Sequence, residues 1–383
     1  MDYRAFLKLL LNESEDAPTA ARRHIIRFRS GIAFRKCMKL MKRLRPNEAA
    51  CPIQPLRMIH AFACPLRSHA KLASFPFIRN IEVDTKMSVH SLSSSLDAIH
   101  RSTAKKPVIP WGVQRIKAPQ AWAYSEGKHV DVGVIDTGID YSHPDLRDCI
   151  GKGLNLIHHH LPPIDDNGHG THIAGIIAAS SASGGIMGVA PKAIIHPVKA
   201  FDRTGSAFVS DIIYGMDWCV QNRIPIINMS FGMKTYSRSL EEAVREAYRA
   251  GCVIVASSGN DGRRSGVDYP AQFAQSISVG ATNEQKKIAP FSNRGKRIDI
   301  YAPGSKIYST SLYGKYSELS GTSMATSHVS GVIALMLAKK PNMTPRQIKM
   351  TLRKQATALL ISSKSGRTIK EVNARKAVIA VMR

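Results

Sequence analysis

The segment Val130-Asp-Val-Gly-Val-Ile-Asp-Thr-Gly138 combines a short apolar run with an acidic residue and a glycine turn. The apolar run predicts a strand that is buried on both faces of a sheet. Asp136 follows this run directly, so it should lie at the carboxyl end of a parallel sheet, where folds of this type build their sites. The segment therefore predicts an α/β domain with an acidic side chain at its functional edge.

The remainder of the chain after Trp111 supports this fold class. Short apolar runs predict further strands at residues 194–199, 224–229, 252–256 and 276–279. Helical periodicity predicts helices at residues 170–179, 211–221, 239–250, 329–339 and 344–355. Because strands and helices alternate, we expect a mainly parallel central sheet with helices on both faces, which makes three layers.

Two further segments place reactive side chains at helix starts. Residues 167–175 (Asn-Gly-His-Gly-Thr-His-Ile-Ala-Gly) hold His169 between glycines that allow close backbone approach. Residues 320–329 (Ser-Gly-Thr-Ser-Met-Ala-Thr-Ser-His-Val) hold Ser323 in the first turn of an apolar helix, where free N–H groups favour negative charge. With Asp136 they supply the parts of a nucleophilic triad, in which serine attacks, histidine takes its proton and aspartate orients the imidazole.

These segments together resemble the subtilisin-like serine proteases (subtilases), and their order is preserved from about Pro110 to about Ala358. The resemblance implies a subtilisin-like fold and a serine endopeptidase with Asp136, His169 and Ser323 as its triad.

The resemblance also extends to the oxyanion site. Residues 255–262 (Val-Ala-Ser-Ser-Gly-Asn-Asp-Gly) match the family segment whose asparagine donates to the oxyanion, which implies that role for Asn260. The backbone N–H of Ser323 is the expected second donor.

Substrate-binding residues follow from the same resemblance. Residues 228–232 (Asn-Met-Ser-Phe-Gly) resemble the strand that pairs with an extended peptide, which implies substrate binding by Ser230 and Gly232. The family usually has a small residue before the Tyr-Pro pair, where this chain has Asp268. An acidic pocket base would favour Lys or Arg at the cleaved position. Alternatively, Asp268 points to solvent and pairs with Arg263 or Arg264.

The N-terminal third predicts a separate small α+β unit. Strands are expected at residues 24–29, 56–63 and 78–83, with a basic helix at 33–44. By position and strand type, the unit resembles the inhibitor I9-like propeptide of the family. That resemblance implies a ferredoxin-like folding chaperone and temporary inhibitor, whose tail lies in the active site until it is cut.

We therefore expect a leader and linker at residues 1–21, a propeptide domain with linker at 22–105, and a catalytic domain at 106–383. Residues 84–110 are Ser-rich, then basic, with two prolines near their end, which favours a linker or cleavage segment. Alignment of the segment that begins at Pro110 puts the cut near Lys105 and Lys106.

The chemistry requires no cofactor, and no residue is a confident metal ligand. Family members often bind Ca²⁺ through a glutamine, an aspartate and a loop asparagine. Asp145 stands at the position of the aspartate, whereas Pro107 and Ala182 replace the glutamine and the asparagine. Since Ca²⁺ takes six to eight oxygen ligands, this site is expected to be weakened or lost, with Asp145 as a weak candidate.

The charge of the chain is unusual, with 54 Lys and Arg against 28 Asp and Glu, or +26 net. Residues 339–383 carry 12 basic residues and one acidic residue, so this tail is the expected place for a polyanion to bind. The other expected partners are protein or peptide substrates and the chain's own propeptide, with no membrane partner. The N-terminus lacks the apolar core of a signal peptide, and six unpaired cysteines suggest a reducing compartment. The expected location is therefore the cytoplasm by default, with export by a non-standard route as the alternative.

Two alternatives remain open on the sequence. The chain could be a basic interaction protein that uses an inactive protease fold to bind nucleic acid or another polyanion, or an enzyme held permanently inhibited by its propeptide. Cleavage of casein that is sensitive to a serine-directed inhibitor distinguishes both from an active protease.

Overall fold

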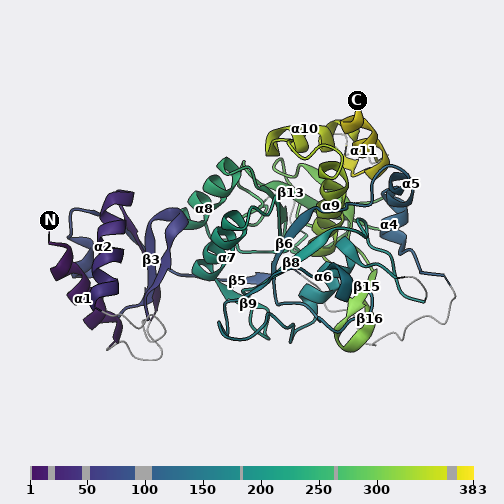
Figure 1. The fold of residues 1–383 in the computed structure, drawn as a ribbon. Helices are drawn as coiled ribbons and strands as arrows, with labels where there is room; N and C mark the ends of the chain where they lie inside the picture. The colour runs from purple at the N-terminus through teal and green to yellow at the C-terminus, as the bar shows by residue number, and fades with distance from the viewer. Residues whose placement is uncertain are drawn as a thin grey trace.

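The computed structural model describes residues 2–15, 22–44, 52–90, 106–181, 184–262, 266–359 and 369–383. Figure 1 shows a small unit at the N-terminal end of the chain beside a much larger α/β unit.

The small unit has one layer of helices on a four-stranded antiparallel sheet with the order β2-β3-β1-β4. Its described elements are α1 (Tyr3–Glu15), β1 (Arg23–Phe28), α2 (Gly31–Leu44), β2 (Gln54–Leu56), β3 (Ala61–Pro65), α3 (Ala70–Ala73) and β4 (Ile78–Val83). Phe6, Phe28, Phe62 and Phe77 fill the space between the layers. The single strand predicted at residues 56–63 is two strands, because a short 3₁₀ turn that ends at the left-handed His60 separates them.

The large unit is built on a nine-stranded sheet in the described residues, with the order β17-β18-β14-β13-β12-β10-β6-β8-β7. Its strands are β6 (Asp131–Asp136), β7 (Leu154–Asn155), β8 (Ile194–Lys199), β10 (Ile226–Met229), β12 (Val253–Ser257), β13 (Ile277–Thr282), β14 (Ile300–Pro303), β17 (Thr357–Ala358) and β18 (Lys370–Glu371). Every neighbouring pair is parallel except β17 with β18. The predicted α/β class with a mainly parallel sheet is confirmed.

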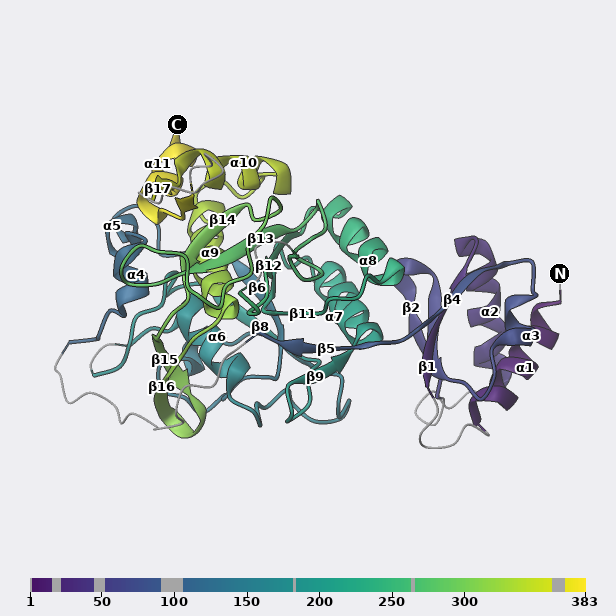
Figure 2. The ribbon, with the colours of Figure 1, turned by 180° about the vertical axis from the view of Figure 1, so that it is seen from behind.

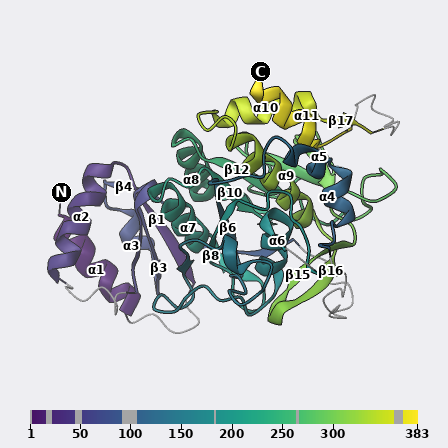
Figure 3. The same cartoon turned by 45° about the vertical axis from the view of Figure 1, so that its right-hand side comes forward.

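Helices cover both faces of this sheet (Figure 3). One apolar core joins the sheet to α4 (Trp111–Arg115), α5 (Ala118–Trp122), α6 (His169–Ala178), α9 (Thr322–Leu337), α10 (Pro345–Gln355) and α11 (Ala374–Met382). A second core joins the opposite face to α7 (Val209–Gln221) and α8 (Arg238–Arg249). Helix α9 begins at Thr322 and so carries Ser323 in its first turn as expected, although helical periodicity marked a helix only from residue 329. Every residue of α9 is buried, so its first turns have no polar face that would reveal a helical period.

The small unit packs on α7 and α8, and its Ile25, Leu56 and Ile59 join the second core. Two of its carboxylates also contact the N-terminal ends of these helices. Glu82 accepts hydrogen bonds from the Ser237 hydroxyl (2.8 Å) and the Ser239 amide (3.2 Å) at the start of α8. Asp84 accepts from the amide (3.0 Å) and the hydroxyl (2.6 Å) of Ser210 at the start of α7. Because free N–H groups at helix starts attract negative charge, the two carboxylates hold the small unit against the large one.

Part of the predicted linker is a strand. β5 (Lys86–Val89) leaves the small unit and lies between β9 (Ser206–Phe208) and β11 (Phe231–Gly232) of the large unit, antiparallel to both. Figure 2 shows the chain crossing between the units along this strand. A β-hairpin of β15 (Ile307–Ser311) and β16 (Lys315–Leu319) completes the described strands.

Among the residues placed in the structure, none of the helices combines the length and apolar character that crossing a bilayer needs.

Candidate active site

Asp136 and His169 meet at the carboxyl end of the central sheet. Asp136 is the last residue of β6 and is fully buried. Its Oδ1 accepts a hydrogen bond from the Thr137 amide (2.8 Å) and lies 2.7 Å from His169 Nδ1. The carboxylate therefore fixes the tautomer of His169 with the proton on Nδ1, which leaves Nε2 as a proton acceptor.

The backbone that presents His169 is held by Asp165, which the sequence does not single out. Oδ1 of Asp165 accepts from the amides of Asn167 (3.0 Å) and Gly168 (2.9 Å), and Oδ2 accepts from the amide (2.9 Å) and hydroxyl (2.6 Å) of Thr171. The amides of Gly168 and Thr171 are among those that the start of α6 would otherwise leave unpaired. Asp165 thus caps the helix whose first residue is His169.

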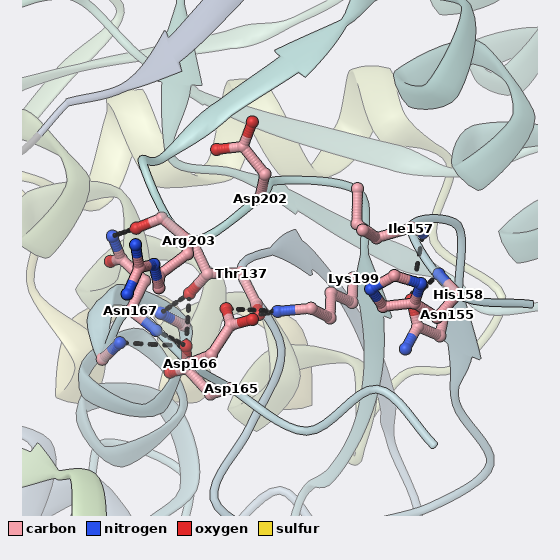
Figure 4. Close-up of polar contacts among 12 residues, drawn as sticks. Thr137, Asn155, Ile157, His158, Asp165, Asp166, Asn167, Lys199, Asp202 and Arg203 are labelled. Atoms are coloured by element: carbon pink, nitrogen blue, oxygen red, sulfur yellow. Dashed lines mark hydrogen bonds and ion pairs between the residues drawn. The ribbon is translucent and has the colours of Figure 1, made fainter. Parts of the chain in front are cut away.

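Thr137 links this cap to the end of β6. Its hydroxyl donates to Asp165 Oδ1 (2.8 Å) and accepts from the Gly170 amide (2.9 Å). Lys199, at the end of β8, donates to the Thr137 carbonyl (2.7 Å) and pairs with Asp166 (2.6 Å). Figure 4 shows these side chains converging on the turn that carries the cap. The strand end with Asp136 and the helix start with His169 are therefore braced together.

Ser323 lies in the first turn of α9, close to the segment that follows β5. Its Oγ is 2.7 Å from the carbonyl oxygen of His90 and 2.7 Å from the carbonyl oxygen of Ser230. Within the described residues, Nε2 of His169 has no hydrogen-bond partner. The serine hydroxyl thus points at neighbouring carbonyls, and in the described residues no hydrogen bond joins it to the imidazole.

Asn260 reaches the same carbonyl from the loop after β12. Its Nδ2 donates to the His90 oxygen (2.9 Å), and its Oδ1 accepts from the amide and the hydroxyl of Thr322, both at 2.9 Å. Because Thr322 engages the oxygen of the amide group, the nitrogen is fixed toward His90. The expected oxyanion donor therefore contacts a carbonyl that also lies beside the expected nucleophile.

The chain itself occupies the cleft as an extended peptide. Val89 and Ser88 pair with Phe231 and Gly232 of β11, and the His90 amide donates to the Ser230 carbonyl (3.1 Å). Of the predicted substrate-binding residues, Ser230 and Gly232 thus contact this segment. This strand was not predictable from the sequence, because the alternation of polar Lys86 and Ser88 with apolar Met87 and Val89 is too short to distinguish a strand from a linker.

The side chain of His90 enters a pocket that contains the third predicted residue. Nε2 of His90 lies 3.1 Å from Asp268 Oδ2, and Nδ1 lies 2.7 Å from the Ser257 hydroxyl. A Cβ atom on Gly232 would lie 2.4 Å from Cε1 of the ring, so a glycine is needed there. We call Gly232, Ser257 and Asp268 the His90 pocket. The alternative in which Asp268 points to solvent does not hold, because Asp268 is buried; Arg263 and Arg264 lie outside the described residues.

Asp145 is not placed as a calcium ligand. Its Oδ2 accepts hydrogen bonds from the Tyr316 hydroxyl and the Ile186 amide, both at 2.8 Å. Both donors engage Oδ2, so a cation bound at that oxygen would have to displace them. Within the described residues no three His, Cys, Asp or Glu side chains gather as metal ligands, and Ala182 lies outside them.

Comparison with known proteins identifies the class. Residues 127–373 match the model of the Subtilase family. Subtilisin E from Bacillus subtilis (strain 168) is 43% identical over 256 residues, covering 66% of this chain and 67% of that protein. Subtilisin from Bacillus pumilus is 42% identical over 271 residues, covering 70% of this chain and 98% of that protein. The protein is therefore a serine endopeptidase that acts on protein or peptide substrates. It belongs to the subtilase family.

The expected cytoplasmic location is wrong on these comparisons. The minor extracellular protease Epr of Bacillus subtilis (strain 168) is 42% identical over 250 residues, covering 65% of this chain and 38% of that protein. The five cysteines that the structure describes do not argue against such relatives, because all five are buried. Cys149 and Cys252 are buried free thiols, and burial raises their pKa to about 12 and about 11, so they remain unreactive without a reducing compartment.

Proposed function

We propose that Asp136, His169 and Ser323 form the catalytic triad, with Asn260 and the Ser323 amide as oxyanion donors. The observation that carries this proposal is the position of the His90 carbonyl oxygen, 2.7 Å from Ser323 Oγ and 2.9 Å from Asn260 Nδ2. A carbonyl held between a nucleophile and a preorganised donor is poised for acyl transfer.

Each residue has a defined step in this reaction. Ser323 Oγ turns toward His169, passes its proton to Nε2 and attacks the carbonyl carbon, while Asn260 stabilises the negative oxygen. Asp136 stabilises the imidazolium that forms. His169 then gives its proton to the leaving amine, and water repeats the sequence to hydrolyse the acyl-enzyme. No step needs a cofactor.

We further propose that the chain is made as a zymogen and cuts itself after His90, at the bond to Ser91. The support is that His90 has its carbonyl beside Ser323, whereas Lys106 lies sixteen residues further along and Lys105 is outside the described residues. Before release, β5 fills the cleft and residues 2–90 act as an intramolecular inhibitor, held by Glu82 and Asp84 on α7 and α8. Asp268 would favour a residue at the cleaved position that can donate a hydrogen bond to its carboxylate, as His90 does here.

The test uses the full chain and a matched serine control. Wild-type protein should show a new N-terminus at Ser91 by mass spectrometry and should cleave casein, and Ser323→Ala should abolish both. Ser327→Ala, one turn later on α9 with its hydroxyl bonded to the Ser323 carbonyl, should retain both. Processing that persists in Ser323→Ala would falsify the triad, and a processed N-terminus near Lys106 would place the cut where the sequence alone put it.

A polyanion remains our proposed partner for the C-terminal tail. One surface hollow is lined by Lys354 of α10, by Arg375 and Lys376 of α11 and by Arg383, which follows α11. This concentration of positive charge favours anionic groups. On a heparin column, the wild-type protein should elute at a higher salt concentration than the Arg375→Ala, Lys376→Ala double variant. Elution at the same salt concentration would exclude this surface as the polyanion site.

A further inference from the structure

The His90 pocket offers a hydrogen-bond partner to each nitrogen of an imidazole. Asp268 faces Nε2 and Ser257 faces Nδ1, on opposite edges of the ring. Between them Cε1 lies against Gly232, where even a methyl group would overlap it. The pocket therefore matches the ring in its polar groups as well as in its width.

Both protonation states of histidine satisfy this arrangement. A neutral ring donates from Nε2 to Asp268 and accepts at Nδ1 from the Ser257 hydroxyl. A protonated ring donates from both nitrogens, and the Ser257 hydroxyl can then turn to the Phe231 carbonyl, 3.4 Å away. In either state each polar group of the pocket keeps a partner.

An apolar side chain would remove the donor that His90 gives to Asp268 Oδ2. Asp268 is buried, and its other side-chain contact is the amide nitrogen of Asn293 at 3.4 Å. Gly259 packs against the same carboxylate, since a Cβ atom there would lie 2.6 Å from Oδ2. A phenylalanine would cover Asp268 without donating to it, and a site built for hydrogen bonds rejects analogues that lack them.

Lysine and arginine fit less well for a reason of length. Their charged groups stand more bonds from the backbone than Nε2 of histidine does. Because His90 Nε2 is already 3.1 Å from Asp268, a longer chain must fold back or displace the carboxylate. It would also leave Ser257 without the partner that Nδ1 provides.

We propose that the His90 pocket selects histidine at the residue whose carbonyl is attacked, in preference to lysine, arginine and large apolar residues. This inference rests on the proposed function, because it assigns the specificity of the same site. It predicts that the enzyme cleaves proteins after histidine and that its own processing site is such a bond.

The test compares peptides of one sequence on the self-processed full chain. The series Lys-Met-Ser-Val-X, which copies residues 86–89 and ends in a fluorogenic amide, carries His, Lys, Arg, Phe or Asn at X. The His peptide should have the highest kcat/KM, by about tenfold or more over Lys and Phe. A Lys, Arg or Phe peptide that matches or exceeds the His peptide overturns the inference.

Pocket variants identify the residue responsible. Asp268→Asn should lower kcat/KM for the His peptide by about tenfold while leaving the Phe peptide equal or faster. Asp261→Asn is the matched control, because Asp261 lies in the neighbouring loop and pairs at the surface with Lys234; it should preserve the His-to-Phe ratio. An unchanged ratio in Asp268→Asn overturns the role of the pocket.

The possible outcomes distinguish a failure of this specificity from a failure of the proposed triad. If casein and all peptides resist cleavage, or are cut equally by Ser323→Ala, the triad proposal fails and the specificity fails with it. If cleavage requires Ser323 but ignores residue X, the triad stands and the specificity alone is wrong. Full-length His90→Phe and His90→Lys chains give an internal check, since both should process about tenfold more slowly than wild type.

Discussion

At the scale of single residues, Asn260 has the most sharply defined task. Its Oδ1 is engaged by Thr322, which leaves Nδ2 to contact the carbonyl of His90. A donor that is fixed before the reaction costs no reorganisation when negative charge develops on the oxygen.

Replacing Asn260 should therefore affect the rate far more than binding. Asn260→Ala should reduce kcat about 10²–10³-fold with KM changed only a few-fold, as measured on a fluorogenic peptide. Asn260→Asp keeps the acceptor for Thr322 but removes the donor, so it should be equally impaired. A kcat within threefold of wild type in either variant would contradict the oxyanion role.

At the scale of elements, the start of α6 depends on one carboxylate. Asp165 caps amides of the turn before His169 and of the first turn of the helix, and it also accepts from Thr137 at the end of β6. Strand and helix are thereby joined through a single side chain.

Loss of this cap should cost both stability and activity. Asp165→Ala should lower the free energy of unfolding by about 1–2 kcal/mol in urea, measured in a Ser323→Ala background to prevent autolysis. In the active chain the same change should lower kcat/KM, because His169 is less well placed. Asp148→Ala, an exposed acidic residue, serves as the control. Unchanged stability in Asp165→Ala would show that water replaces the cap.

The contact between the small unit and α7 depends on Arg23. Its guanidinium lies 3.2 Å from Asp84 and 3.6 Å from Asp211, and burial raises the pKa of both carboxyls, that of Asp211 to about 6. Without Arg23 the two buried acids would face one another without a cation.

Arg23→Ala should therefore weaken the non-covalent complex between the cleaved small unit and the large unit. We expect the apparent Kd of that complex after processing to rise at least about tenfold, as read from co-elution in size-exclusion chromatography. Arg22→Ala, its exposed neighbour, should behave as wild type. Equal retention in both variants would show that the apolar contacts and β5 suffice.

At the scale of the whole molecule, two buried histidines should make the fold sensitive to acid. Burial lowers the pKa of His328 to about 4 and that of His172 to about 3, from a usual value of 6.5. The unfolded chain binds these protons near pH 6.5, whereas the folded chain binds them only below pH 4. These two groups therefore leave the free energy of unfolding unchanged above pH 6.5 and lower it as pH falls toward 4. Each unit of difference between the folded and unfolded pKa is worth about 1.4 kcal/mol.

Urea unfolding of Ser323→Ala at pH 7.5, 5.5 and 4.5 should show this loss directly. His328→Gln should flatten the dependence, whereas His158→Gln, an exposed histidine, should leave it unchanged. If the free energy of unfolding falls equally with pH in the Ser323→Ala parent and in both histidine variants, the acid sensitivity belongs to other groups.

Much of the large unit was predictable because its strands are buried on both faces. The runs at residues 194–199 and 130–135 are rich in Val and Ile, and they form β8 and β6 within a residue or so of the expected bounds. The helix over Ser323 was harder to delimit, since α9 is buried all round. The single strand expected at residues 56–63 failed because the left-handed turn at His60 carries none of the usual turn residues.

The sequence by itself determined the α/β class, the order of the motifs and the residue types of the expected triad, because these depend on local pattern and on chemistry that few side chains can perform. Only the tertiary structure decided that residues 86–90 lie as an extended strand beside β11 and Ser323. Nothing local in residues 84–90 distinguishes a linker from a strand; its pairing partners, β9 and β11, lie more than a hundred residues away. The same holds for the His90 pocket, since the partners of one imidazole come from β11, β12 and the loop before Tyr269, and only folding brings them together.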